Sequence, residues 1–342
     1  MPQTPIAMAA DTNHNDILAL PVLSYSPEAG FMFGGVTHFI HQPGPNCKLS
    51  NVVAGATYST EDQFQFFTKP TWYFEGGEYS LDGLLEFQKR TDKFYGVGNN
   101  TDDADEELFT HRRMRFEAEF DKRVWSHMRM GLHLGYSKTR MLETDPEGLL
   151  TAGNLRGNDD NVNLGFGVTT AWDSRDNSLY PRKGVYYKIG MIFYEDGLAS
   201  TWSYRTLDVD VRHYFSLNDN TVFAFRMNYG DVAGEAPVTE LAQLGGKNLL
   251  RGYFKGRYRD RHLLALQTEM RFNIWGKFGG VLFASAGEVA PEISDFKMRQ
   301  VHLAAGAGLR YQLTESGLNA RIDFGFGSDG IGGPYVTGME AF

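Results

Sequence analysis

Apolar and polar residues alternate along much of this chain, and the alternation is clearest from His262 to Trp275. One face of this segment carries Leu264, Leu266, Met270, Phe272 and Ile274, and the other carries Gln267, Glu269, Arg271 and Asn273. A period of two residues indicates a β-strand. One face is charged and the other is large and apolar, so neither resembles an ordinary solvent-exposed surface. The pattern therefore predicts a strand with lipid on its outside and a polar lumen on its inside.

The same period recurs from Arg113 to Trp125 and from Met128 to Lys138, where charged or small residues alternate with Met, Leu, Phe and Tyr. A lysine or arginine that faces the bilayer midplane costs about 2 to 4 kcal/mol. A register slip of one residue would turn every charged side chain of such a strand toward lipid. The sequence therefore determines which face of each strand points outward.

Turn and breaker residues divide the chain into about sixteen strands, an even number as bacterial outer-membrane barrels have. The expected strands are Ile17–Ser26, Phe31–Ile40, Asn51–Thr60, Gln63–Phe74, Tyr79–Thr91, Arg113–Trp125, Met128–Lys138, Asn163–Trp172, Val185–Glu195, Trp202–Phe215, Thr221–Asp231, His262–Trp275, Phe278–Val289, Gln300–Leu313, Asn319–Gly327 and Gly333–Phe342. We interpret residues 16–342 as one barrel domain. Residues 1–15 form an N-terminal segment, read either as the remnant of a signal peptide, from the Ala7-Met8-Ala9 pattern, or as an ordinary disordered start.

The lengths of the connections support this division. Long connections precede the strands that begin at Arg113, Asn163 and His262, and each of these is an odd-numbered connection. Even-numbered connections such as Gly76-Gly77 and Gly276-Lys277 are short. In an up-and-down barrel this puts the long loops at one end, as expected for extracellular loops opposite short periplasmic turns.

Composition excludes several other classes of protein. The 342 residues include 39 glycines and 14% aromatic residues, yet the mean hydropathy is -0.36. No run of about 18 apolar residues exists, which excludes membrane-spanning helices. A net charge of -9 argues against nucleic-acid binding, and a single cysteine rules out an internal disulfide framework.

Signatures of catalysis are also missing from the sequence. It contains no Gly-x-Ser-x-Gly elbow, no His-Glu-x-x-His helix and no cysteine spacing of a metal site. The acidic segment from Asp102 to Glu107 lacks the spacing of a calcium loop. We therefore expect no enzyme, no catalytic residue, no cofactor and no metal.

Several motifs carry a family resemblance. They are ALPVLSYSPEAGFMFGG near the start, FYGVGNNT at residues 94–101, DSRDNSLYPRKG at 173–184, LLRGY at 249–253, VLFASAGEV at 281–289, AAGAGLRYQL at 304–313 and the terminal GMEAF. With them the chain resembles the barrel of the BamA/TamA superfamily of outer-membrane assembly and translocation proteins. The resemblance implies an all-β, sixteen-stranded transmembrane barrel in the outer membrane of a Gram-negative bacterium, with its sixth extracellular loop folded back into the lumen.

The resemblance also assigns roles to residues of that loop. Its tip would be Leu250, Arg251, Gly252 and Tyr253, with Arg251 contacting an acidic residue of the inner wall. Glu269 is the expected acceptor, and Asp323 and Glu288 are the alternatives. A guanidinium offers a planar fork for a carboxylate, so such a pair would pin the loop. Whether it acts as a moving lock or as a purely structural ion pair stays open at this stage.

One departure from the family pattern changes the expected number of partners. Family members often carry an acidic residue in a Phe-x-Asp-x-Gly pattern, where this chain has Phe283, Ser285 and Gly287. The arginine is therefore expected to have one acidic partner instead of two.

Two further groups of residues match the family. The expected periplasmic turn contains Asp173, Arg175, Asp176, Asn177, Pro181 and Gly184, which would either recruit a periplasmic partner or simply cap the turn. The last strand is expected to include Gly338 and Phe342.

The function implied by the resemblance is insertion or translocation of polypeptide or lipid at the outer membrane. The alternatives are a passive channel or structural barrel, and an export barrel for a separately encoded passenger. Only about fifteen residues precede the first strand, so the chain looks like a barrel-only member without periplasmic POTRA domains. Expected partners are outer-membrane lipid and lipopolysaccharide, a polypeptide or lipid client, and the barrel-assembly machinery that inserts the protein itself.

Overall fold

The computed structural model describes residues 14–26, 28–42, 48–152, 155–328 and 330–342. The start of the N-terminal segment, including the Ala7-Met8-Ala9 pattern, lies outside the described residues. Within these ranges, no helix is both long and apolar enough to cross a bilayer.

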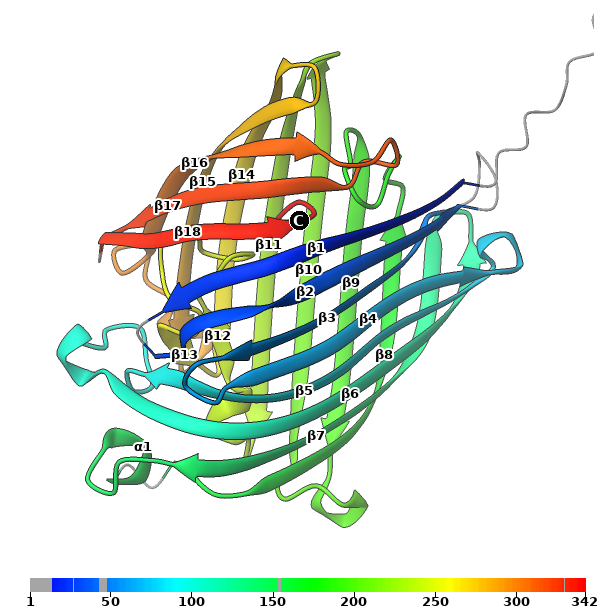
Figure 1. Cartoon of the computed structure of the whole chain (residues 1–342). Helices are drawn as coiled ribbons and strands as arrows, with labels where there is room; N and C mark the ends of the chain where they lie inside the picture. The colour runs from blue at the N-terminus through cyan, green and yellow to red at the C-terminus, as the bar shows by residue number, and fades with distance from the viewer. Residues whose placement is uncertain (1–13, 27, 43–47, 153–154, 329) are drawn as a thin grey trace, which may run out of the picture.

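Sixteen strands form one antiparallel sheet in which sequence neighbours pair with each other (Figure 1). They are β1 (His14–Ser26), β2 (Gly30–Gln42), β3 (Ser50–Ser59), β4 (Phe64–Phe74), β5 (Tyr79–Phe94), β6 (Glu107–Trp125), β7 (Met128–Glu143), β8 (Asn161–Asp173), β9 (Gly184–Tyr194), β10 (Tyr204–Asn218), β11 (Thr221–Gly234), β14 (His262–Trp275), β15 (Phe278–Ala290), β16 (His302–Gln312), β17 (Asn319–Gly327) and β18 (Gly330–Gly338). The hydrogen-bonded order runs from β1 to β18, so these two strands border a seam. The expected sixteen-stranded barrel is thereby confirmed.

In the described parts of the connections, the elements are short. They are the hairpin β12 (Ala242–Leu244) and β13 (Tyr258–Asp260), the helix α1 (Leu149–Ala152), and 3-10 turns at Glu75–Gly77, Asp103–Asp105, Asp196–Leu198, Val238–Glu240 and Ile293–Asp295. The hairpin belongs to the connection between β11 and β14, and it forms a separate two-stranded sheet.

Strand boundaries differ most from the sequence interpretation next to the first long loop. β6 begins at Glu107 and not at Arg113, and β5 continues to Phe94. Phe94 and Glu107 still pair with each other there. The alternation of apolar and polar residues is lost in this region, but backbone pairing does not depend on it, so the strands extend past the stretch that the pattern marks.

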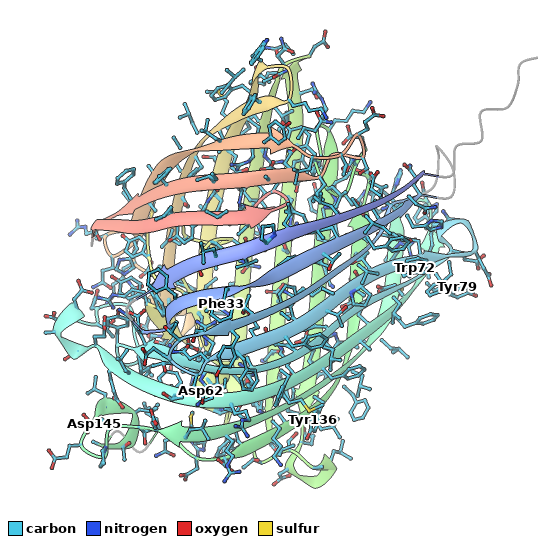
Figure 2. All side chains as sticks on the ribbon, viewed as in Figure 1. Phe33, Asp62, Trp72, Tyr79, Tyr136 and Asp145 are labelled. Atoms are coloured by element: carbon cyan, nitrogen blue, oxygen red, sulfur yellow. The ribbon has the colours of Figure 1, made fainter. Side chains whose placement is uncertain are left out.

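Side chains divide between an apolar outside and a charged inside, as the alternation predicts. Leu266 and Met270 of β14 are 40% and 39% exposed, whereas Glu269 and Arg271, on the other face of the same strand, are buried. Other outward-facing apolar residues include Phe33 on β2, which is 51% exposed and appears on the outer surface in Figure 2. The lumen is therefore the polar core of the molecule, and lipid contacts the outer face.

The two ends of the barrel differ as the connection lengths indicate. Figure 2 labels Asp62 and Asp145 in odd-numbered connections at one end, and Trp72 and Tyr79 at the opposite end. Both β1 and β18 have their chain termini at the end marked by Trp72 and Tyr79 (Figure 1). Outer-membrane barrels have their short turns at the periplasmic end, so the end marked by Trp72 and Tyr79 corresponds to that side.

Candidate functional site: the loop lock in the lumen

The connection between β11 and β14 folds into the lumen because glycines let its backbone turn sharply. Gly245, Gly246, Gly252 and Gly256 all have positive φ, between 75° and 129°. At Gly245 a Cβ atom would lie 2.0 Å from the Phe254 carbonyl oxygen, so only glycine fits there. The hairpin of β12 and β13 then returns the chain toward β14.

Arg251 at the tip of this loop is completely buried and contacts two carboxylates. Its Nη1 donates a hydrogen bond to Asp323 Oδ2 of β17 at 2.6 Å, and its Nη2 donates to Glu269 Oε1 of β14. The guanidinium carbon also lies 3.6 Å from the centre of the Phe283 ring. One side chain of the loop thus joins two strands of the wall.

The expectation of a single acidic partner for Arg251 is wrong. Ser285 on β15 indeed offers no carboxylate, but Asp323 on β17 supplies the second one from two strands further along the sheet. Glu269 and Asp323 are therefore simultaneous partners and not alternatives. Glu288 has a different role, since its carboxylate accepts hydrogen bonds from the backbone N–H of Lys297 at 2.8 and 3.1 Å.

Further charged side chains surround this pair of contacts. Arg271 donates to Glu269 at 2.8 Å, Arg310 donates to Asp323 at 2.6 Å, and Arg321 lies 3.4 Å from Asp323. Arg310 also pairs with Glu340 of the C-terminal segment at 2.7 Å. The network thus contains four arginines and three carboxylates, and its formal charge is one unit positive.

The other residues of the tip are fixed by hydrogen bonds and packing. The Gly252 N–H donates to the Tyr335 hydroxyl of β18 at 3.1 Å, and that hydroxyl donates to the Tyr253 carbonyl at 3.3 Å. The Tyr253 hydroxyl donates to the Leu303 carbonyl at 3.0 Å. Leu250 is fully buried in an apolar cluster with Tyr253. The tip thereby contacts β16 and the seam strand β18 as well.

Glycines of β17 form a slot that admits the loop, and our sequence analysis did not recognise them. A Cβ atom at Gly325 would lie 2.6 Å from the Arg251 carbonyl oxygen, and one at Gly327 would lie 2.6 Å from the Tyr253 ring. Side chains at these positions would exclude the tip. Two glycines on one face of a late strand were the available signal, although strand glycines have several other uses.

A second loop packs against the first. Arg257 donates to the Thr101 hydroxyl at 2.7 Å and to the Thr101 carbonyl at 2.9 Å, and its guanidinium stacks on Tyr95. Gly98 forms a bridge with Arg259. The FYGVGNNT motif therefore belongs to the same site, which its position in the sequence did not indicate, since Thr101 and Arg257 are 156 residues apart.

The charged residues that follow the tip are mostly buried. A run of charged residues in a loop is ordinarily solvated, but Arg257, Arg259 and Asp260 are only 4 to 5% exposed. Arg259 lies over the Phe94 ring at 5.0 Å, and the Asp260 carboxylate accepts the Arg261 N–H at 2.8 Å. Contacts between the two loops exclude water from this charged stretch.

The turn between β8 and β9 is capped by its own polar side chains. Asn177 Oδ1 accepts the N–H groups of Leu179 and Tyr180 at 2.7 and 3.1 Å. Asp176 Oδ1 accepts the Arg182 N–H at 3.0 Å. Pro181 and Gly184 complete the turn, and a Cβ atom at Gly184, where φ is 103°, would lie 2.3 Å from the Ser174 carbonyl oxygen.

Asp173 forms the base of this turn. Its carboxylate accepts hydrogen bonds from Arg175 Nε at 2.9 Å and from Lys48 Nζ at 2.6 Å. Partial burial lowers the pKa of the Lys48 ammonium, and the Asp173 carboxylate opposes that shift.

The end of the last strand differs from the sequence interpretation. β18 ends at Gly338, so Phe342 is not part of the strand. Met339 has a φ of 66°, which turns the chain away from the sheet, and Phe342 is buried against Tyr214. The Phe342 carbonyl accepts a hydrogen bond from Arg271 at 2.9 Å. Burial of the Phe342 ring and the hydrogen bond from Arg271 together stabilise this conformation more than continued pairing of residues 339–342 in the strand would.

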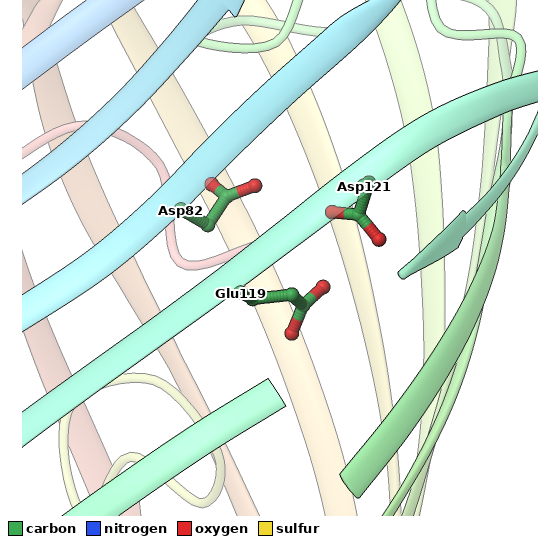
Figure 3. Close-up of side chains that lie close together, drawn as sticks. All are labelled: Asp82, Glu119 and Asp121. Carbon is green, nitrogen blue, oxygen red and sulfur yellow. The ribbon is translucent and has the colours of Figure 1, made fainter. Parts of the chain in front are cut away.

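A separate group of carboxylates lies in the lumen near the periplasmic end. Asp82 of β5 and Glu119 and Asp121 of β6 point toward one another, each with an oxygen within 4.8 Å of the others (Figure 3). They border a cavity of about 290 Å³. Thr71 donates to Asp82 at 2.6 Å, and the Lys188 ammonium lies 2.6 Å from Glu119. A divalent cation at this position would have to share Glu119 with that lysine.

Comparison with known proteins supports the assignment that the geometry suggests. Residues 48–331 match the Omp85 superfamily domain, and no curated protein matches the chain. Among solved structures the chain is similar to BamA from Haemophilus ducreyi lacking POTRA domains 1-3, with a TM-score of 0.62 at 14% identity over 96% of this chain and 70% of that one.

Two CdiB structures are also similar to the chain. CdiB from Acinetobacter baumannii has a TM-score of 0.55 at 11% identity, and CdiB from Escherichia coli has 0.59 at 11% identity. The alignments cover 95% and 91% of this chain but 58% of each CdiB chain. The sixteen-stranded barrel and the family match together show that the chain is an outer-membrane β-barrel of the Omp85 superfamily of assembly and translocation proteins.

Proposed function

We propose that this barrel helps to insert or translocate polypeptide or lipid at the outer membrane, and that the loop between β11 and β14 acts as a lock during this work. The observation that carries the proposal is the buried Arg251, which holds the loop in the lumen through Glu269 and Asp323 at once. Both ion pairs of the tip converge on one arginine, so the loss of a single side chain breaks them together. A lumen that must open to pass a client needs such a contact.

The seam between β1 and β18 supports the same proposal as the working edge of the barrel. The loop tip is bonded to β18 through Tyr335, so a movement of the loop is transmitted directly to a seam strand. The outward-facing apolar residues contact outer-membrane lipid, and the extracellular end faces lipopolysaccharide. We expect the protein itself to be inserted by the barrel-assembly machinery.

The experiment that tests this function compares cells that lack the chain with cells that carry wild type or Arg251→Ala. Outer-membrane and secreted proteins and outer-membrane lipids are quantified in each strain. We expect cells that lack the chain to lose a defined set of proteins or lipids. Wild type should restore this set, and Arg251→Ala, present at the same abundance in the membrane, should not.

An unchanged proteome and lipid composition would refute the proposal. Conductance of the purified barrel in planar bilayers then separates the remaining possibilities. Steady single-channel currents would indicate a passive channel, and a silent barrel would indicate a structural role. Loss of one secreted protein alone would indicate an export barrel for a separately encoded passenger.

A further inference from the structure

The turn between β8 and β9, residues 174–183, reaches across the mouth of the barrel. β8 and β9 are the eighth and ninth of the sixteen strands, so they lie on the wall opposite the seam between β1 and β18. The turn nevertheless contacts residues that border the seam. A ten-residue connection on the far wall can do this only by crossing the periplasmic opening.

On one side of the seam the turn contacts the first strands. Lys48, next to β3, forms an ion pair with Asp173 at 2.6 Å. Leu179 at the tip of the turn is 3% exposed and packs in a cluster with Ile40 of β2 and Leu49. Both contacts connect the far wall with the N-terminal edge of the sheet.

On the other side of the seam the turn contacts the last strands. Asn177 Nδ2 donates to the Ser316 carbonyl at 2.8 Å, in the connection between β16 and β17. Leu318, just before β17, is fully buried in the same cluster as Leu179. A Cβ atom at Gly317 would lie 3.2 Å from the Tyr180 Cβ, which shows how closely the two connections approach.

Other contacts in this region cross the seam directly. The Ser316 hydroxyl donates to Asp16 of β1 at 3.0 Å. Leu18 of β1 and Met339, just after β18, both pack against the cluster that contains Leu179. The apolar cluster therefore has members from both edges of the sheet, with the side chain of the turn among them.

We propose that the β8–β9 turn is a brace that holds the seam closed at its periplasmic end. Leu179 is packed against both edges at once, so separating β1 from β18 would expose it together with Ile40 and Leu318. The capped backbone of the turn gives the brace a fixed shape before the seam closes. Release of the brace would let the seam widen at this end, while the ion pairs of Arg251 with Glu269 and Asp323 stay in place.

The proposal goes beyond the function given above, and its test needs no client. The test uses the purified barrel in lipid nanodiscs, with Cys47→Ser as background and spin labels on Ile17→Cys of β1 and Val336→Cys of β18. These two side chains are 74% and 72% exposed on the outer face, so the labels do not touch the brace. A second label pair, Leu23→Cys of β1 and Phe326→Cys of β17, the strand next to β18, reports on the opposite end of the seam.

Leu179→Ala and the milder Asn177→Ser are compared with Leu217→Ala. Leu217 is 61% exposed near the same end and does not belong to the cluster, so it matches the chemical change without touching the brace. We expect Leu179→Ala to increase the population of long periplasmic distances at least tenfold over wild type. We also expect a smaller increase for Asn177→Ser, and wild-type distances for Leu217→Ala and at the opposite end.

Unchanged periplasmic distances in both Leu179→Ala and Asn177→Ser would overturn the brace. Equal widening at both ends of the seam would overturn it too, because it would indicate general loosening of the barrel. If Leu179→Ala does not fold, the periplasmic label distances of Asn177→Ser and Leu179→Met test the brace in its place. Failure of the cellular test above would leave these results intact, since they are measured on the barrel alone.

Discussion

Replacing Arg251 with methionine tests the lock most directly. Methionine keeps an unbranched apolar stem that can still lie on the Phe283 ring, but it removes both hydrogen bonds to Glu269 and Asp323. The two carboxylates do not become isolated, because Arg271 and Arg310 remain bonded to them. The change therefore removes the tether of the loop without leaving an unpaired buried charge.

The expected cost follows from these contacts. A hydrogen bond to a charged group contributes about 1.5 to 3 kcal/mol. Two such bonds are lost, and the network changes from one net positive charge to neutral, which offsets part of the loss. We expect about 3 kcal/mol, which corresponds to a roughly hundredfold larger equilibrium constant for detachment of the loop.

Limited proteolysis of the folded barrel measures this detachment. Trypsin can cleave the loop after Lys247 or Lys255 once the loop leaves the lumen, and cleavage follows the open population when opening is fast. We expect cleavage to be faster by about two orders of magnitude in Arg251→Met. Arg251→Lys should fall in between, because an ammonium cannot bridge both carboxylates. The exposed Arg123→Met is the control.

A second measurement with Asp323→Asn can refute the reasoning. In the wild-type background, Asp323→Asn leaves four arginines with two carboxylates in the network. In the Arg251→Met background, it leaves three arginines with two carboxylates. Asp323→Asn should therefore destabilise wild type more than it destabilises Arg251→Met. Two results would show that Arg251 does not hold the loop through these carboxylates. One is a cleavage rate of Arg251→Met within about threefold of wild type. The other is that the stability losses of Arg251→Met and Asp323→Asn add within about 0.5 kcal/mol in the double variant.

Three further predictions concern the surroundings of the lock. Gly325→Ala puts a Cβ atom 2.6 Å from the Arg251 carbonyl oxygen and should make the loop accessible to trypsin. Gly190→Ala, where the atom nearest to the new Cβ lies at 3.5 Å, should not. Equal cleavage of the two variants would contradict the proposal that the glycines of β17 admit the loop tip. Tyr335→Phe removes the hydroxyl between the loop tip and β18 and should lower the free energy of unfolding by about 1 kcal/mol in urea, so no measurable loss would argue against that contact. Arg257→Met should speed cleavage of the loop at residues 95–106 roughly tenfold with a protease specific for acidic residues, whereas the exposed Arg156→Met should not, because exposed ion pairs contribute about 0 to 1 kcal/mol. Similar rates for the two variants would show that the two loops are independent.

The sequence by itself determined the architecture of this protein. Alternation with a period of two separates lipid-facing from lumen-facing side chains within each strand, and this separation is a local property. The number of strands, the outward face of β14 and the end that carries the long loops all followed from it. Boundaries were less certain where charged residues interrupt the pattern, as at the start of β6.

The local chemistry of some site residues could also be anticipated. The Asp and Asn residues that precede Pro181 indicated a capped turn. The family resemblance pointed to Arg251 as the tip residue and to Glu269 as its partner. These expectations depend on short stretches of sequence, which is why they could be made without a fold.

Only the tertiary structure decided which distant residues meet. Asp323 is 72 residues from Arg251, and Asn177 is 139 residues from Ser316, yet each pair is in contact. Such contacts arise when a curved sheet brings strands from both ends of the chain around one lumen. Alternation specifies that a side chain points inward, but the curvature of the sheet and the folding of loops across its interior specify what it meets there. For that reason the second carboxylate, the glycine slot and the reach of the β8–β9 turn became visible only in the folded barrel.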